Sequence, residues 1–221
     1  SNDKGENWYR IPVSTGLTLD LIRNMINKND TLIVTDFLNK EIFQSSDTGK
    51  TWINIPFQFA QNHLFNDLVI YNDSLILATD KGVYEYSLST NEWKLKYNKT
   101  FDKLFTPDSL LFASNNYGFY RWNKTNSEFI FSNNGINTAY VYDVIEFDSA
   151  LYAVTRSGAF YTINDGETWS DIKKLEEKWC HTIEVLDTMV FIGTNNGVYG
   201  KSANSESWAQ LNNGLSAIEA R

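Results

Sequence analysis

An aromatic residue that closes a short polar turn recurs along this chain at intervals of about forty residues. The two clearest copies are residues 45–52, with the sequence SSDTGKTW, and residues 162–169, with the sequence TINDGETW. In order, the closing aromatics are Trp8, Trp52, Trp93, Phe129, Trp169 and Trp208. A repeat of this length is typical of propellers and solenoids, so it restricts the fold before any single residue is considered.

Two further markers divide each repeat into short strands. A glycine followed by an apolar and an aromatic residue, as in Gly82-Val83-Tyr84, stands eleven residues before each of the last four closing aromatics. An acidic turn and an apolar run, as in Asp73-Ser74-Leu75, come before that glycine. In the second repeat these markers predict strands over residues 68–71, 75–79, 83–86 and 93–95. Four strands in each repeat, without long amphipathic helical stretches, favour propeller blades over helical repeats.

The sequence therefore predicts an all-β fold, a β-propeller of four-stranded antiparallel blades. Five repeats are complete, and partial blade sequence stands at both termini, which gives about six blades if the ring closes. We expect residues 1–221 to form a single β-propeller domain, either by themselves or as a segment of a longer protein, since all-β domains of about 200–250 residues are common.

The turn motif resembles the Asp-box (BNR) repeat, S-x-D-x-G-x-[ST]-W. This repeat occurs in sialidases, sortilin-type receptors, xyloglucan-cleaving glycosidases and photosystem II assembly factors. The matching residues are Ser45, Asp47, Gly49 and Trp52 in one copy, and Asn164, Gly166 and Trp169 in another. The repeats that end at Trp93, Phe129 and Trp208 have Leu88, Lys124 and Ala203 in the Asp position. The resemblance supports the fold and does not by itself imply an activity.

Each residue of the box has a structural role to play. A tight hairpin needs a residue with positive φ, which glycine supplies. The Asp or Asn side chain can accept backbone N–H groups of the same turn. The tryptophan ring can pack between neighbouring sheets. Because the box recurs where no single active site could use every copy, we interpret Asp47 and Asn164 as structural residues and not as catalytic residues or metal ligands.

Composition narrows the class of partner. The net charge is −8 and no block of Lys and Arg stands out, so neither nucleic acid nor an anionic membrane surface is expected as a partner. No apolar run is long enough to cross a bilayer, and membrane insertion is not expected. The single cysteine, Cys180, excludes an internal disulfide, and the pair Cys180-His181 lacks the further ligands of a zinc site. No metal and no cofactor is predicted.

Catalytic motifs receive little support. Residues 9–12, YRIP, resemble the [FY]-R-I-P signature of sialidases, whose arginine is similar in role to a clamp on the sialic acid carboxylate. The repeat places this segment at the same position as residues 53–56, so we interpret it as an outer strand. His63 and His181 are the only histidines, and no Ser–His–Asp arrangement is indicated. Paired carboxylates remain possible, so a glycoside hydrolase of the Asp-box group stays an alternative.

The leading hypothesis is a non-catalytic module that presents a loop-lined face to a protein or glycan partner. Structural or sensor function within a larger exported protein is a further alternative. We expect the binding face at the turns between the second and third strands of each blade, because these turns vary while the framework repeats. The candidate residues are Asp36, Lys40, Asp80, Lys81, Asn116, Tyr117, Arg156, Asn195 and Asn196. The family resemblance implies an extracytoplasmic location, and the oligomeric state is left open.

Overall fold

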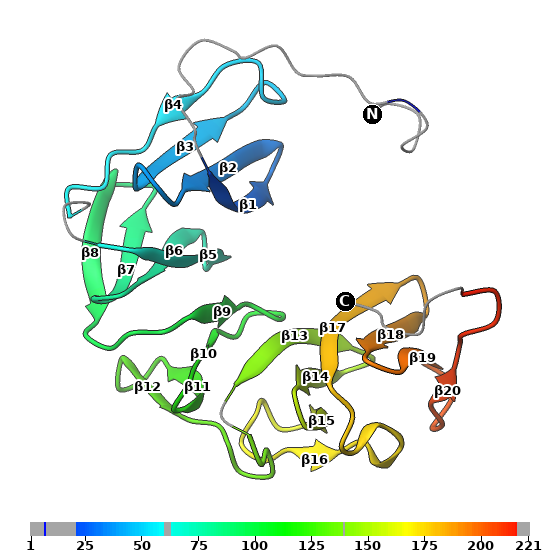
Figure 1. Ribbon diagram of the computed structural model, residues 1–221. Coiled ribbons are helices and arrows are strands. Elements are labelled where there is room, and N and C mark those ends of the chain that lie inside the picture. Colours follow the sequence, from blue (N-terminus) through cyan, green and yellow to red (C-terminus); the bar gives the residue numbers. More distant parts are fainter. Residues whose placement is uncertain (1–6, 8–20, 60–62, 139, 216–221) are drawn as a thin grey trace. The chain divides into compact units, whose positions relative to one another are not determined.

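The structure is a computed structural model that describes residue 7 and residues 21–59, 63–138 and 140–215 (Figure 1). The chain divides into two compact units, Ser1–Asn98 and Lys99–Arg221. The described part contains five four-stranded sheets, two in the first unit and three in the second. We call these sheets blades 1 to 5 in chain order.

The first unit holds blades 1 and 2. Blade 1 consists of β1 (Ile22–Lys28), β2 (Thr31–Asp36), β3 (Glu41–Ser45) and β4 (Ile53–Asn54). Blade 2 consists of β5 (Phe65–Tyr71), β6 (Ser74–Thr79), β7 (Gly82–Ser87) and β8 (Glu92–Tyr97). The four strands predicted for the second repeat are confirmed, and each is longer than its sequence markers indicated.

The second unit holds blades 3 to 5. Blade 3 consists of β9 (Lys103–Phe105), β10 (Phe112–Asn115), β11 (Gly118–Asn123) and β12 (Glu128–Phe131). Blade 4 consists of β13 (Val141–Phe147), β14 (Ala150–Thr155), β15 (Gly158–Thr162) and β16 (Ser170–Asp171), followed by the short 3₁₀ helix η1 (Lys173–Leu175). Blade 5 consists of β17 (Cys180–Leu186), β18 (Met189–Thr194), β19 (Gly197–Ser202) and β20 (Ala209–Gln210).

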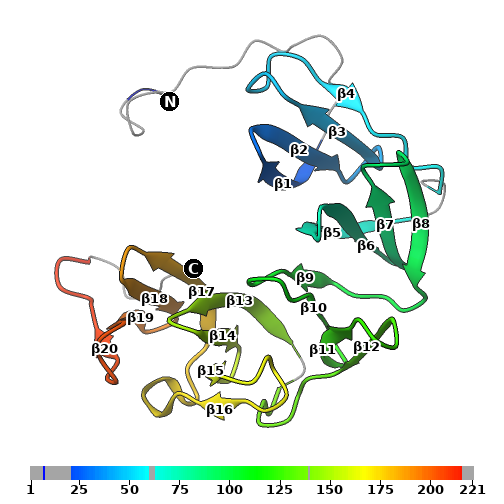
Figure 2. The same cartoon turned by 180° about the vertical axis from the view of Figure 1, so that it is seen from behind.

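Every blade is an antiparallel meander in which the strands pair in chain order, as both views show (Figures 1 and 2). This topology confirms the predicted all-β class and the four-stranded blade. That residues 1–221 form one domain of about six blades stays a prediction. The Trp8 copy of the box and the segment at residues 9–12 lie outside the described residues.

The central strands of each blade carry the core. In β6 the run Leu75–Ala78 is completely buried, and all six residues of β14 are buried. Strands covered on both faces read as continuous apolar runs instead of alternating ones, which explains the apolar segments after each acidic turn. In the second unit one core cluster joins blades 4 and 5 through residues such as Val154, Ile183 and Ile192.

The acidic marker of the sequence is the hairpin between the first and second strands. Asn72 and Asp73, between β5 and β6, have φ values of 46° and 62°, and Asp148 and Ser149, between β13 and β14, have values of 53° and 60°. Two successive left-handed residues form the hairpin turn whose twist matches that of the strands, and Asn and Asp tolerate this conformation well. The marker is therefore turn chemistry.

The helical content of the described residues is limited to the single turn η1. No helix in that part of the chain is long and apolar enough to cross a membrane.

Candidate binding site

The turns between the second and third strands are built to a common plan in blades 2, 4 and 5. A buried threonine ends the second strand, at Thr79, Thr155 and Thr194. Each threonine hydroxyl donates to the carbonyl oxygen of the glycine that begins the third strand, at 2.8–3.0 Å. It also accepts the backbone N–H of the second turn residue, at 3.0–3.1 Å. The threonine thus holds the turn from below, and the two turn residues between it and the glycine are exposed or half-buried in each of these blades.

The structure places eight of the nine predicted face residues in or at these turns with exposed or half-buried side chains. The exposed ones are Asp80, Lys81, Asn116, Tyr117, Arg156, Asn195 and Asn196, and Lys40 is half-buried. Tyr117 is 85% exposed. Asp80 is the only acidic residue among these eight, and its Oδ1 accepts the backbone N–H of Leu64 at 2.7 Å. Binding at these residues remains a proposal.

Asp36 is the ninth predicted residue, and its assignment to the exposed face is wrong. It has no exposed surface. Its Oδ1 accepts the backbone N–H groups of Leu38 at 2.8 Å and Asn39 at 3.1 Å. The side chain therefore braces the longer turn of blade 1 from inside, in the place that threonine occupies in other blades, and it cannot contact a partner.

The first strands of blades 1, 2, 4 and 5 each contain a β-bulge near their start. The pairing register shifts between Ile22 and Asn24, Phe65 and Asp67, Val141 and Asp143, and Cys180 and Thr182. The extra residues at these bulges are Arg23, Asn66, Tyr142 and His181. A bulge turns a side chain away from the regular alternation, and bulges often lie beside functional sites.

The residue after the bulge connects neighbouring blades. In the first unit Asn24 Nδ2 donates to Asp67 Oδ1 at 2.7 Å. In the second unit Asp143 accepts the backbone N–H of Val144 at 2.9 Å and that of Ile183, in blade 5, at 3.5 Å. Burial raises the pKa of Asp143, and the two N–H groups act in the opposite direction. These contacts fix the position of the bulged residues.

In the second unit the bulges bring together a group of aromatic residues and an arginine, which we call the Trp179 cluster. Its members are Tyr140, Tyr142, Arg156, Trp179 and His181. The Arg156 guanidinium carbon lies 4.8 Å from the centroid of the Trp179 ring. The ring of His181 lies 4.9 Å from that of Trp179, and Tyr142 lies 6.5 Å from it in a stacked arrangement. Tyr140 continues the row, with its ring 5.2 Å from that of Tyr142.

The Trp179 cluster is both accessible and fixed. The side chain of Trp179 is 37% exposed, and its carbonyl oxygen accepts the backbone N–H of Asn195, a residue of the β18–β19 turn, at 3.0 Å. His181 Nε2 is buried and has no hydrogen-bond partner in the described part of the chain. The cluster therefore offers a rigid aromatic surface and one guanidinium group to an incoming group, while the unpaired ring nitrogen of His181 lies beneath that surface.

Sequence reasoning found Arg156 and missed Trp179, Tyr140 and Tyr142. Trp179 stands in a segment that has the composition of a blade-to-blade connection, after Lys173–Lys178. The signal that could have found it is the aromatic residue directly before or at the start of a first strand, which recurs at Tyr140 and Tyr142.

The first unit has a related pair. The guanidinium carbon of Arg23, at the bulge of β1, lies 4.9 Å from the centroid of the Phe37 ring in the β2–β3 turn. Arg23 Nε also donates to the carbonyl oxygen of Asn66, at the bulge of β5, at 3.0 Å. An arginine thus stacks on an aromatic ring beside a turn between the second and third strands in each unit. In the first unit the arginine lies in the first strand and the ring in the turn. In the second unit the arginine lies in the turn and the ring directly before a first strand.

The box of blade 1 makes the contacts expected of a structural turn. Asp47 Oδ1 accepts the Thr51 backbone N–H at 2.9 Å and the Ser45 hydroxyl at 2.8 Å. Oδ2 accepts the Thr51 hydroxyl at 2.7 Å. These hydrogen bonds, chiefly the one from the Thr51 backbone, lower the pKa of Asp47 to about 2. Gly49 has φ of 85°, and its carbonyl oxygen accepts the indole N–H of Trp52 at 3.1 Å.

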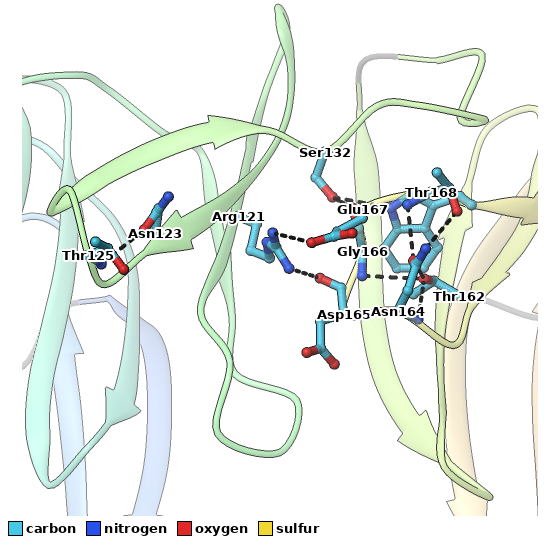
Figure 3. A network of polar contacts seen from close by, with 11 residues as sticks. Arg121, Asn123, Thr125, Ser132, Thr162, Asn164, Asp165, Gly166, Glu167 and Thr168 are labelled. Atoms are coloured by element: carbon cyan, nitrogen blue, oxygen red, sulfur yellow. Dashed lines mark hydrogen bonds and ion pairs between the residues drawn. The ribbon is translucent and has the colours of Figure 1, made fainter.

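The box of blade 4 repeats this network with an amide (Figure 3). Asn164 Oδ1 accepts the Thr168 backbone N–H at 3.1 Å and the Thr162 hydroxyl at 2.7 Å, and Gly166 has φ of 80°. Trp169 is only 4% exposed and donates to the hydroxyl of Ser132, in the segment after β12, at 3.2 Å. In this copy the tryptophan packs between neighbouring sheets as predicted, against the rings of Phe112 and Phe119 in blade 3.

The described residues contain no group of three or more His, Cys, Asp and Glu that could hold a metal ion. Cys180 is fully buried at the start of β17, and burial raises the pKa of its thiol to about 12. At neutral pH it is therefore a protonated core residue.

Comparisons with known proteins support the fold. No family model matches the chain. The uncharacterized membrane glycoprotein YNR066C of Saccharomyces cerevisiae is 21% identical in an alignment 229 positions long, which covers 94% of this chain and 50% of that protein. The chain therefore spans about half the length of this curated relative.

Solved structures similar to the chain are propeller domains. The extracellular domain of BT4673 from B. thetaiotaomicron has a TM-score of 0.71 at 15% identity, over 95% of this chain and 29% of that one. An ancestral GH74 enzyme has a TM-score of 0.67 at 14% identity, over 90% of this chain and 32% of that one. YCF48 from Cyanidioschyzon merolae has a TM-score of 0.68 at 14% identity, over 91% and 75% respectively. YCF48 has also been solved bound to D1 peptide. These similarities confirm the propeller fold class.

Proposed function

We propose that this chain is a non-catalytic binding propeller that holds a protein partner on the Trp179 cluster and the neighbouring turn residues. The observation that carries the proposal is the stacked pair of Arg156 and Trp179, which stands partly exposed beside the β14–β15 and β18–β19 turns.

The physical reason is the type and rigidity of these side chains. Trp, Tyr and Arg supply most of the binding energy at protein interfaces, because they combine a large contact area with hydrogen bonding. Arg156 and Trp179 are already stacked on each other, so they lose little conformational freedom when a partner binds. The surrounding turn tips, such as Asn195 and Asn196, provide amide groups on a rigid frame.

The comparisons are compatible with a protein partner and an extracytoplasmic location. YCF48 is similar in fold and binds D1 peptide, which is a property of that protein. The similar domain of BT4673 is extracellular, and the curated relative is a membrane glycoprotein. From these likenesses we extend to this chain a binding role and a location outside the cytoplasm.

A displayed library of random peptides tests the proposal, because selection from it does not require that the natural partner be identified. Peptides selected for binding to the wild-type chain are measured by isothermal titration against Arg156→Ala and Trp179→Ala. We expect each substitution to lower the affinity for the selected peptides at least tenfold, since loss of an interface anchor costs about 2 kcal/mol or more of binding free energy. Phe131→Ala is the matched control, because Phe131 is also aromatic and is 68% exposed on β12 of the same unit.

Two results would overturn the proposal. In one, the selected peptides bind Arg156→Ala and Trp179→Ala as tightly as the wild-type chain. In the other, Phe131→Ala weakens them by the same factor. Thermal melting of each variant checks that the fold is retained, and we expect little change because Arg156 and Trp179 lie at the surface.

A further inference from the structure

A groove opens between blades 4 and 5 of the second unit, beside the turn that precedes Trp208. Its volume is about 810 Å³. Its walls include Tyr152, Tyr161, Trp208, Lys174, Lys201 and Glu206. In blade 4 it is lined from β14, β15, β16 and η1, and in blade 5 from β19 and the β19–β20 turn. None of its lining residues belongs to the Trp179 cluster.

At the preceding boundary, between blades 3 and 4, side chains of blade 3 contact the box turn of blade 4 in the corresponding place (Figure 3). Arg121 Nη1 donates to the carbonyl oxygen of Asp165 at 2.9 Å, and its other terminal nitrogen pairs with Glu167 at 3.6 Å. The Ser132 hydroxyl contacts the carbonyl oxygen of Gly166 at 2.5 Å. The box turn of blade 4 is thus anchored on blade 3 by two polar side chains.

Both anchors are absent at the boundary between blades 4 and 5. Tyr161 stands three residues after Gly158, the position that Arg121 has after Gly118. Ile172 donates its N–H to Ala159 as Ser132 does to Phe119, so Ile172 takes the place of Ser132. Tyr161 and Ile172 cannot make the hydrogen bonds and the ion pair that Arg121 and Ser132 make. They therefore do not anchor the facing turn of blade 5 on blade 4.

The turn of blade 5 has also lost the residue that allows close approach. Gly166 stands eight residues after Gly158, and Ser205 stands eight residues after Gly197. A Cβ added at Gly166 would lie 2.8 Å from a ring carbon of Phe112 and 2.9 Å from Ser132 Oγ. Only glycine fits that approach, so a serine keeps the blade 5 turn at a greater distance from blade 4. The groove is the space that results.

Three aromatic rings line the groove. The centroid of the Tyr152 ring lies 6.3 Å from that of Tyr161 and 6.1 Å from that of Trp208. Tyr161 is 38% exposed, so one ring of the row is open to solvent. Aromatic side chains with a few convergent polar groups are the usual lining of a ligand site, and the volume lies within the usual range of about 300–1,000 Å³.

Charged groups of both signs surround these rings. Lys201 Nζ donates to the hydroxyl of Tyr152 at 3.2 Å, which holds the ammonium group at the wall. Lys173 Nζ forms an ion pair with Asp171 Oδ2 at 2.6 Å. Lys174, Lys201 and Glu206 make no ion pair with any residue that the structure describes. The groove therefore has two cations and one carboxylate available to a ligand, in a chain whose net charge is −8.

We propose that this groove binds a short oligosaccharide that carries a carboxylate. A sugar hydroxyl both donates and accepts hydrogen bonds, so lysines and a carboxylate can bind it together. The apolar face of a sugar ring can cover Tyr161, and the excess of lysine favours a uronic acid over a neutral sugar. A peptide strand is disfavoured because β16 and β20, the outer strands at this boundary, are two residues long and offer little edge for pairing.

Nuclear magnetic resonance with uronic-acid tetrasaccharides tests the proposal. The probes are tetragalacturonate, a hyaluronan tetrasaccharide and a mannuronate tetrasaccharide, each also as its carboxyl methyl ester. We expect at least one acid to shift the indole N–H signal of Trp208 and to bind at least five times more tightly than its ester. Tyr161→Ser should lower the affinity for that acid at least fivefold, and Lys174→Glu should lower it at least threefold. Lys124→Glu, the same charge change on the strand 3–4 turn of blade 3, should alter affinity by less than twofold.

The proposal is overturned if none of the acids shifts the Trp208 signal, if the esters bind as well as the acids, or if Tyr161→Ser leaves the affinity unchanged. Lys174 is exposed and lies outside the core, so its variant remains informative if Tyr161→Ser is unstable. Trp179→Ala should leave sugar binding unchanged, which separates failure of this proposal from failure of the proposed protein-binding role.

Discussion

The boxes of blades 1 and 4 have nearly the same internal geometry and different surroundings. Asp47 and Asn164 each accept a backbone N–H four residues ahead and a hydroxyl two residues behind. Yet Trp52 is half-buried and donates to its own turn, whereas Trp169 is 4% exposed and donates to Ser132 in the neighbouring blade. The local network is therefore independent of the packing of the tryptophan, and the two effects can be measured separately.

The largest effect should come from the tryptophan that is fully packed. We expect Trp169→Ala to lower the free energy of unfolding by about 3–5 kcal/mol, the range for deleting a large buried aromatic side chain. Trp52→Ala should cost less than half of that, because part of its ring is in contact with solvent already. Urea unfolding followed by circular dichroism gives both values. Equal losses would show that the half-buried ring of Trp52 contributes as much as the buried one.

Substitution of the two box glycines should follow the same order, with a larger loss of unfolding free energy in blade 4 than in blade 1. The difference should be smaller than that between the two tryptophans. Gly49 and Gly166 have φ values of 85° and 80°, so alanine is strained in both turns and should cost about 1 kcal/mol. At Gly166 the new methyl group would also meet Phe112 and Ser132, and overpacking adds about 1–3 kcal/mol. Both glycines are buried, so comparison of Gly49→Ala with Gly166→Ala in the same urea titration measures how much more the contacts of Gly166 with Phe112 and Ser132 cost. If the two substitutions cost the same, blade 3 accommodates the methyl group and the boundary is looser than described.

The smallest effect should be a pH dependence that the box of blade 1 has and the box of blade 4 lacks. The pKa of Asp47 is lowered from 3.8 to about 2 in the folded chain, chiefly by the Thr51 backbone N–H. A lowered folded-state pKa contributes stability that is present above pH 3.8 and is lost as the pH falls toward 2. We expect Asp47→Asn to flatten the decline of the melting temperature in this window. Asn164 has no carboxylate, so Asn164→Asp should steepen the decline. Unchanged profiles in both variants would contradict this role of the side chains.

Much of the fold follows from local sequence signals. The box turns, the acidic hairpins and the paired second and third strands are predictable because each depends on residues within about ten positions of one another. The threonine braces at Thr79, Thr155 and Thr194 depend on equally local contacts, although the sequence markers do not include them. The sequence misplaces Asp36 because an acidic residue at the end of a strand gives the same pattern whether it faces solvent or braces the turn.

The candidate sites depend on contacts that no short segment contains. Trp179 meets Arg156 across more than twenty positions of the chain, and the bulges that direct Tyr142 and His181 arise from strand pairing. The groove beside Trp208 likewise reflects the replacement of Arg121 and Ser132 by Tyr161 and Ile172 in the facing blade. The effect of these replacements becomes visible only when the strands are aligned in space.

Local sequence is enough to specify the blade, its four strands and the conformation of its turns, because backbone strain and turn hydrogen bonds involve neighbouring residues. Packing between blades determines which tryptophan is buried, which boundary contains a groove and which turn residues are exposed. These outcomes depend on how side chains of one blade fit against the next, and van der Waals contact and hydrogen bonding act only over a few ångströms in space.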